Sequence, residues 1–201
     1  MRCYHYGVTS QNPRQLPRDV TTVLLDRDGV LNQKMPEGRY VERWKDFHVL
    51  PGVPEAIARL NQAGLRVIVV SNQRGIALGL YTAADVDALH AGFQSLLSQH
   101  GAHIDAFFYC PHLVGRCNCR KPLPGLFEQA VEAFPDVTAA TSLMIGDSLV
   151  DMEFGRRLGI TTILIDGETE QPRATAKIAR DTADLRFPSL AEAADALLDE
   201  R

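Results

Sequence analysis

The chain has 201 residues, 45% of them hydrophobic, which is enough for one globular domain or for one domain with a small insertion. Its net charge of −4, with acidic and basic residues interspersed, argues against a protein that binds nucleic acid, because such proteins usually present a basic face. No run approaches about 20 apolar residues, and the N-terminus lacks the apolar segment of a secretory signal. We therefore expect a cytoplasmic protein without a membrane span.

Strand-like runs alternate with helical patterns along the chain. Residues 1–19 are polar and contain proline, which predicts an extended lead-in, and one domain is expected over 20–201. Short β-rich runs predict strands at 21–26, 65–72, 104–110, 141–147 and 160–166. Apolar residues at helical spacing predict helices at 51–64, 82–101, 124–134, 149–159 and 190–200. This alternation predicts the α/β class: a Rossmann-like, doubly wound parallel sheet with helices on both faces.

Four of the predicted strands end in polar residues that are capable of chemistry. These are Asp26, the pair Ser71 and Asn72, Cys110, and Asp147. Because ligands bind at the carboxyl ends of parallel strands, we expect these side chains to meet at one edge of the sheet. Acids scattered at random through loops would not show this pattern.

The acidic residues at two strand ends suggest a cation site. Asp26 and Asp28 are two residues apart, and Gly29 permits a tight turn directly after them. Two close carboxylates repel each other unless a cation or a proton lies between them. Asp147 ends another strand, and Asp151 lies four residues later, on the same face of the following turn. Such a set predicts Mg²⁺, and the alternative is that Asp28 and Asp151 merely cap a turn and a helix.

The same residues also suit phosphoryl transfer. A carboxylate can act as the nucleophile and form an aspartyl-phosphate. The reaction needs Mg²⁺ and cations that neutralise the phosphoryl oxygens, and Lys121 supplies such a charge. Ser71 and nearby backbone N–H groups offer a phosphate cradle at a strand-to-helix turn. Asp28 is suited to protonate the leaving alkoxide and then to activate water.

Four motifs carry a resemblance to a known family. In chain order, DRDGVLN, SNQ, RKP and GDSLVDM resemble the motifs of the haloacid-dehalogenase (HAD) superfamily of phosphatases, over residues 20–166. The resemblance implies the HAD fold, with Asp26 as nucleophile and Asp28 as general acid and base. It also implies that Ser71 and Lys121 hold the transferring phosphate.

The resemblance further implies a magnesium site. Mg²⁺ would be bound by the Asp26 carboxylate, the Asp28 backbone carbonyl and Asp147, with Asp151 in support.

The stretch CPHLVGRCNCRKP holds four soft or borderline metal ligands within ten residues, namely Cys110, His112, Cys117 and Cys119. Tetrahedral Zn²⁺ accepts a set of three cysteines and one histidine, and a site with four protein ligands is structural. The alternative is a disulfide between Cys110 and one of the other two cysteines, which a reducing compartment disfavours. We therefore expect a zinc loop over 110–119.

This loop resembles the zinc loop of one HAD branch, which lacks a large cap domain. The branch contains histidinol-phosphate phosphatases and D-glycero-D-manno-heptose 1,7-bisphosphate phosphatases, and its residue that matches Arg120 contributes to substrate recognition. The stretches SNQRGIALGLYT and GRYVERWKDFHVLPGV are more similar to the heptose-bisphosphate group. The chain departs from that group's pattern at Arg74, Leu78 and Ser148. The resemblance implies hydrolysis of the 7-phosphate of the heptose bisphosphate, with histidinol phosphate or another small phosphomonoester as the alternative.

The candidate substrate-binding residues are polar and follow the predicted strands. They are Asn72, Gln73, Arg74, Arg120 and Arg39. We expect Arg39, in a loop long enough to line the pocket, to meet a second phosphate. Arg74 is expected either to replace a charge absent at Leu78 or to be an ordinary exposed arginine. The expected partner is a small phosphorylated sugar, with the protein a monomer or a small homo-oligomer. A hypothesis from another class is a non-catalytic zinc-dependent interaction module, which predicts strand ends that do not converge.

Overall fold

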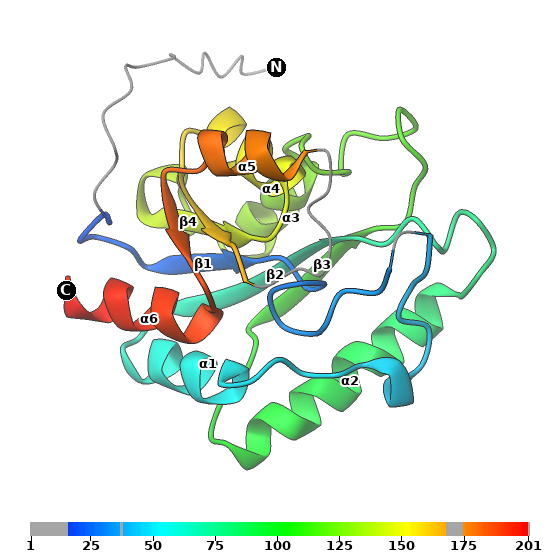
Figure 1. Ribbon diagram of the computed structural model, residues 1–201, viewed down its shortest axis with the longest axis horizontal. Coiled ribbons are helices and arrows are strands. Elements are labelled where there is room, and N and C mark those ends of the chain that lie inside the picture. Colours follow the sequence, from blue (N-terminus) through cyan, green and yellow to red (C-terminus); the bar gives the residue numbers. More distant parts are fainter. Residues whose placement is uncertain (1–15, 37, 168–174, 201) are drawn as a thin grey trace.

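A computed structural model describes residues 16–36, 38–167 and 175–200. Within them, six strands form one parallel sheet in the order β3-β2-β1-β4-β5-β6 (Figure 1). The strands are β1 (Thr22–Leu25), β2 (Arg66–Asn72), β3 (Ala106–Cys110), β4 (Ser142–Gly146), β5 (Thr161–Ile165) and β6 (Leu185–Phe187). The predicted Rossmann-like parallel sheet is confirmed.

Strand β1 lies at the centre of the sheet. Its first residue, Thr22, is opposite Arg66 of β2 on one side and Ser142 of β4 on the other. All of β1 is buried, as expected of a strand covered on both faces. The strand order reverses between β1 and β4, and parallel α/β sheets bind their ligands at such a switch point.

Helices cover both faces of the sheet. They are α1 (Val53–Gln62), α2 (Ala83–Gln99), α3 (Gly125–Ala133), α4 (Leu149–Leu158), α5 (Ala176–Thr182) and α6 (Leu190–Asp199), together with the 3₁₀-helices η1 (Trp44–Asp46) and η2 (Ala139–Thr141). Figure 1 shows α1, α2 and α6 on one side and α3, α4 and α5 on the other. Each face has its own apolar core, so the sheet is doubly wound, as predicted.

Burial of apolar side chains anchors these helices to the sheet. Ile57 and Leu60 of α1 and Phe93 of α2 are fully buried in one core, and Leu126 of α3 and Phe154 of α4 are fully buried in the other. Each such side chain contributes roughly 1.5–3 kcal/mol to folding. The loops at the carboxyl edge of the sheet therefore project from a rigid support.

Side-chain caps fix where two of the helices begin. Thr82 caps α2, and its Oγ1 accepts a hydrogen bond from the Asp85 backbone N–H at 3.2 Å. At the start of α4, the Asp151 carboxylate accepts from the Ser148 N–H at 3.2 Å and from the Ser148 hydroxyl at 2.6 Å. Because α4 begins directly after β4, this contact holds Asp151 at the edge of the sheet.

Two short elements, α5 and β6, were not predicted. They have seven and three residues, too few to show a helical or alternating apolar pattern. In the described part of the chain, the connections from β1 to α1 and from β2 to α2 contain no second sheet, in keeping with a fold without a large cap. Most of the lead-in expected at 1–19 lies outside the described residues. None of the helices described is long and apolar enough to cross a bilayer.

Candidate active site

Three carboxylates lie together at the carboxyl edge of the sheet. Asp26 follows β1, Asp147 follows β4, and Asp151 belongs to the first turn of α4; oxygens from the three lie within 4.8 Å of one another. Gly29 allows the side chain of Asp147 to lie close to the backbone of the turn after β1, because a Cβ atom at Gly29 would lie 2.4 Å from Asp147 Oδ2. The strand ends therefore converge as predicted, and the alternative of strand ends that do not converge is wrong.

Lys121 brings a positive charge into this group of acids. Its Nζ lies 3.0 Å from Asp26 Oδ1 and 2.6 Å from Asp151 Oδ1, and the residue is only 2% exposed. Burial by itself would lower the pKa of Lys121, but the charges of Asp151 and Asp26 outweigh it and raise the pKa. The side chain is therefore an ammonium that can neutralise a bound anion.

Asp26 is a carboxyl group for which a proton and a cation compete. Burial raises the pKa of Asp26 to about 7; the charge of Lys121 opposes this shift, whereas Asp151 and Asp147 add to it. In the absence of a further cation, the group therefore binds a proton near neutral pH. A cation beside it favours the carboxylate, the form that can act as a nucleophile.

Asp28 is held by three neighbouring side chains. Its carboxylate accepts hydrogen bonds from Arg27 Nη2 at 3.0 and 2.9 Å, from Asn32 Nδ2 at 3.0 Å and from Gln73 Nε2 at 3.2 Å. Burial raises the pKa of Asp28, but the charge of Arg27 and these hydrogen bonds together lower it below its usual value. Asp28 is therefore held as a carboxylate, the form that accepts a proton.

Arg27 was missed by the sequence analysis. The residue is 1% exposed, and its guanidinium carbon lies 5.9 Å from the centre of the Phe47 ring. Phe47 in turn stacks on Trp44 of η1, with ring centres 5.3 Å apart. Arg27 lies at the bend after β1, where no periodic pattern indicates the direction of a side chain.

Gln73 connects the end of β2 to Asp28. Its Nε2 donates to Ser71 Oγ at 2.8 Å as well as to Asp28, and its Oε1 accepts from the Tyr81 hydroxyl at 2.8 Å. Gln73 and Ser71 are both buried. These contacts orient Ser71 and Asp28 relative to each other, and the substrate-binding role of Gln73 stays a prediction.

Asn72 ties the end of β2 to the loop after β3. Its Nδ2 donates to the Lys121 carbonyl at 3.0 Å, and its Oδ1 accepts from the Lys121 N–H at 3.0 Å. The Gln73 N–H also donates to the Cys110 carbonyl at 2.8 Å. The structure thus places the Asn72 amide against the backbone of Lys121, and its predicted contact with substrate stays a prediction.

The loop after β3 brings the four predicted soft ligands together. Cys110 Sγ lies 3.5 Å from Cys117 Sγ and 3.6 Å from His112 Nδ1, which lies 3.3 Å from Cys119 Sγ. Zinc–sulfur and zinc–nitrogen bonds of about 2.3 and 2.0 Å give tetrahedral edges of about 3.5–3.8 Å, close to these separations. A disulfide needs sulfurs about 2.05 Å apart, and the three cysteines of this loop are free, so the disulfide alternative is wrong. The set fits a tetrahedral metal.

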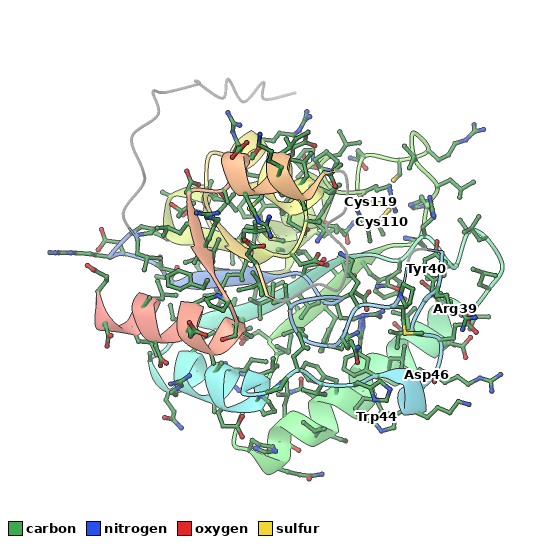
Figure 2. The ribbon with its side chains drawn as sticks, in the orientation of Figure 1. Arg39, Tyr40, Trp44, Asp46, Cys110 and Cys119 are labelled. Atoms are coloured by element: carbon green, nitrogen blue, oxygen red, sulfur yellow. The ribbon has the colours of Figure 1, made fainter. Side chains whose placement is uncertain are left out.

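The three candidate arginines lie on loops at the same edge of the sheet. Arg39 and Arg74 are exposed, and Arg120 is partly exposed. Arg74 Nη2 donates to the Tyr40 hydroxyl at 2.9 Å, which links the turn after β2 to the connection between β1 and α1. Figure 2 shows Arg39 and Tyr40 in that connection. The roles predicted for these arginines in substrate binding stay predictions.

Lys34 was also missed by the sequence analysis. Its Nζ donates to Asp147 Oδ1 at 2.6 Å and also to Asp147 Oδ2. Lys34 lies in the irregular segment after β1, where no periodic pattern indicates the direction of a side chain.

The donors at the sheet edge suit a hard cation. Both oxygens of Asp151 are engaged, one by Lys121 and the other by Ser148. Lys34 likewise contacts both oxygens of Asp147, and the metal roles expected for Asp26, Asp147 and Asp151 stay predictions. Oxygens on one Mg²⁺ ion at about 2.1 Å lie up to about 4.2 Å apart, so a small closure of the group of acids would accommodate the ion.

The fold and the site together define a class of protein. A doubly wound parallel sheet carries Asp26 after its central strand and Asp28 two residues later. The buried Lys121 lies beside Asp26, and Asp147 follows β4, across the switch point. This arrangement is the one expected of a hydrolase that uses a carboxylate nucleophile.

Comparison with known proteins agrees with this class. The model of the haloacid dehalogenase-like hydrolase family matches residues 16–159. The D-glycero-alpha-D-manno-heptose-1,7-bisphosphate 7-phosphatase of Mycobacterium bovis is 36% identical over 176 residues, which is 87% of this chain and 90% of the relative. The D-glycero-beta-D-manno-heptose-1,7-bisphosphate 7-phosphatase of Pseudomonas aeruginosa is 36% identical over 177 residues, 88% of this chain and 97% of the relative. The chain belongs to the haloacid dehalogenase-like hydrolase family.

A solved structure is similar over most of the chain. The D,D-heptose 1,7-bisphosphate phosphatase of B. bronchiseptica, complexed with magnesium and phosphate, superposes with a TM-score of 0.78 at 33% identity. The match covers 90% of this chain and 100% of that one. The predicted HAD fold is confirmed.

Proposed function

We propose that the protein is a Mg²⁺-dependent phosphatase that hydrolyses a sugar phosphate through an aspartyl-phosphate on Asp26. The observation that carries this proposal is the position of Asp26, whose carboxylate lies 3.0 Å from the buried Lys121 ammonium and beside Asp147. A nucleophile, a counter-charge and, two residues away, an acid–base group thus meet at one strand end. The names of the relatives support the same reaction.

In the first step, Asp26 is the nucleophile. A carboxylate oxygen of Asp26 forms a bond to phosphorus while the bond from phosphorus to the sugar oxygen breaks. The leaving oxygen takes a proton from Asp28, which must first bind that proton from water, against the preference of Arg27, Asn32 and Gln73 for its carboxylate form. Lys121 and Ser71 hold the phosphoryl oxygens and stabilise the charge that develops on them.

In the second step, water replaces Asp26 on phosphorus. The Asp28 carboxylate takes a proton from the water as its oxygen bonds to phosphorus, and the bond to Asp26 breaks to release inorganic phosphate. The contacts of Arg27, Asn32 and Gln73 with Asp28 favour the carboxylate form that this step needs. They also keep the side chain of Asp28 in one orientation.

Both sets of metal donors have a place in this proposal. Mg²⁺ would be held by the Asp26 carboxylate, the Asp28 backbone carbonyl and Asp147, with Asp151 in support, and it neutralises phosphoryl charge when bound. Zn²⁺ would be held by the four Cys and His side chains of the loop after β3. Because all four positions of that site are protein ligands, its role would be structural.

We propose D-glycero-D-manno-heptose 1,7-bisphosphate as the substrate, with hydrolysis at the 7-phosphate. Relatives with this named activity match the chain over 87% and 88% of its length. A bisphosphate carries a second anionic group, and Arg39, Arg74 and Arg120 lie on loops at the same edge of the sheet as the carboxylates. Arginine suits this task because its planar group binds phosphate through paired hydrogen bonds.

A panel of purified substrates tests the proposal. We expect the kcat/KM for the heptose bisphosphate, supplied as each anomer, to exceed those for fructose 1,6-bisphosphate and histidinol phosphate. Arg120→Gln should lower kcat/KM for the bisphosphate by roughly tenfold or more, the value of one charge-assisted contact. Arg116→Gln, which removes an exposed arginine from the same loop, is the matched control. Equal rates on all sugars would overturn the substrate but leave the phosphatase chemistry in place.

A further inference from the structure

Lys34 reaches from the segment after β1 to the acid after β4. Its ammonium contacts both oxygens of Asp147, one of them at 2.6 Å. The two side chains are 28% and 12% exposed, so the pair is partly shielded from water. The charge of Lys34 also acts on Asp26, whose pKa it lowers, which places the ammonium near the nucleophile as well.

The two lysines at this site differ in their freedom to move. Lys121 is 2% exposed and bridges two acids, Asp26 and Asp151. Lys34 is more exposed, and within the described residues its ammonium donates hydrogen bonds to a single acid. Of the two ammonium groups, Lys34 is therefore the one that can leave its partner without an uncompensated charge being left in the interior.

The present position of Lys34 conflicts with the binding of a divalent cation. A metal ion on Asp147 needs an oxygen that the ammonium already contacts, and two cations on one carboxylate repel each other. When Mg²⁺ binds, the ammonium must leave Asp147. A phosphate on Asp26 is then a nearby anion with which it can pair.

We propose that Lys34 is a tethered cation that occupies the Asp147 side of the metal site, is displaced by Mg²⁺, and then pairs with the bound phosphate. The inference rests on the proposed function, since it takes the three acids as the magnesium site. Lys34 is a positioning residue in this scheme. It weakens metal binding before phosphate arrives and strengthens phosphate binding afterwards, so that metal and phosphate bind cooperatively.

Titration calorimetry on the purified protein tests both effects proposed for Lys34, on Mg²⁺ binding and on phosphate binding. Without phosphate, Lys34→Gln should bind Mg²⁺ roughly two- to fivefold more tightly than the natural protein, because a partly buried ion pair no longer has to be broken. With saturating Mg²⁺, the same variant should bind inorganic phosphate more weakly by a similar factor. Lys34→Arg retains the charge and should stay near the natural protein in both titrations. Lys45→Gln, a change of an exposed lysine in the same connection, should alter neither.

The outcomes separate this inference from the proposed function. If the natural protein binds Mg²⁺ and hydrolyses sugar phosphates, but Lys34→Gln binds Mg²⁺ no more tightly, the role of Lys34 is wrong and the phosphatase stands. If Mg²⁺ affinity rises but phosphate affinity is unchanged, the transfer of Lys34 to phosphate is wrong. If the natural protein neither binds Mg²⁺ nor shows turnover, the proposed function fails, and the inference fails with it.

Discussion

Two polar clusters stand at the same edge of the sheet, and they are assembled in different ways. The cluster of Cys110, His112, Cys117 and Cys119 comes from one loop, so its members are close in the sequence. The acidic cluster of Asp26, Asp147 and Asp151 is drawn from two strand ends and a helix, and Asp26 is far from the other two acids in the sequence. Only the parallel topology brings it together, because every strand of such a sheet ends at the same edge.

The clusters also differ in whether they leave a position for a substrate or another partner. The Cys/His cluster offers four donors at tetrahedral spacing, which leaves no position for a substrate. The acidic cluster is balanced by two lysines, one buried and one partly exposed. A site of the first kind holds a loop in place, whereas a site of the second kind can exchange its partners during a reaction.

The largest expected effect comes from the acidic cluster. Asp26→Asn should lower kcat by roughly 10⁴-fold or more, because it removes the nucleophile and leaves only binding and charge stabilisation. The measurement is phosphate release at saturating substrate, with acid quenching to detect the phosphorylated protein. Asp19→Asn, a change of an exposed acid just before β1, is the control. Activity of Asp26→Asn near that of the natural protein would exclude Asp26 as nucleophile.

A smaller effect on activity is expected from the Cys/His cluster. The natural protein should contain about one zinc per chain, and Cys117→Ser should lose it, because a tetrahedral structural site needs all four ligands. Its kcat should fall by roughly tenfold as Arg120 and Lys121 lose their support. Metal analysis and phosphate release measure the two effects.

Cys3→Ser is the matched control for that experiment, since Cys3 lies apart in the sequence from the Cys/His cluster. An unchanged kcat in zinc-free Cys117→Ser would show that the two clusters are independent. A zinc content that survives the substitution would show that Cys117 is not a ligand.

The smallest effect is on stability and depends on pH. The pKa of Asp26 is about 7 in the fold, against an ordinary value of 3.8, so the stability that its neutral form contributes is lost as the pH rises from about 4 to about 7. The amide that replaces the carboxyl group in Asp26→Asn does not titrate. In Mg²⁺-free buffer, the Tm of this variant minus that of the natural protein should therefore be greater at pH 8 than at pH 5, by roughly 5 °C. An equal difference at both pH values would contradict the raised pKa.

The sequence sufficed for the features that depend on pattern or on local spacing. Alternating strands and helices predicted the sheet, and the polar strand ends predicted that Asp26 and Asp147 would meet. The spacing of the four Cys and His residues in the sequence was enough to predict that they lie together. The motif order then predicted the family, which the comparisons confirm.

The missed features depend on directions that no periodicity reveals. Arg27, Lys34 and Tyr81 lie in turns or irregular segments, and their roles follow from the contacts that their side chains make. The contact of the Asn72 amide with the backbone of Lys121 was not predicted, and the substrate-binding role of Asn72 stays a prediction. A strand-end position alone does not say which of several nearby polar groups a side chain will bind.

Lys121 connects the acidic cluster to the loop that carries the Cys/His cluster. Its ammonium lies between Asp26 and Asp151, while its backbone is bonded to Asn72 and follows Cys119 at a distance of two residues. In the proposed scheme, loss of the Cys and His ligands therefore also displaces the charge that binds phosphate. A thiol-modifying reagent or a zinc chelator is expected to lower kcat by roughly tenfold, as Cys117→Ser does, although the groups proposed to react are carboxylates.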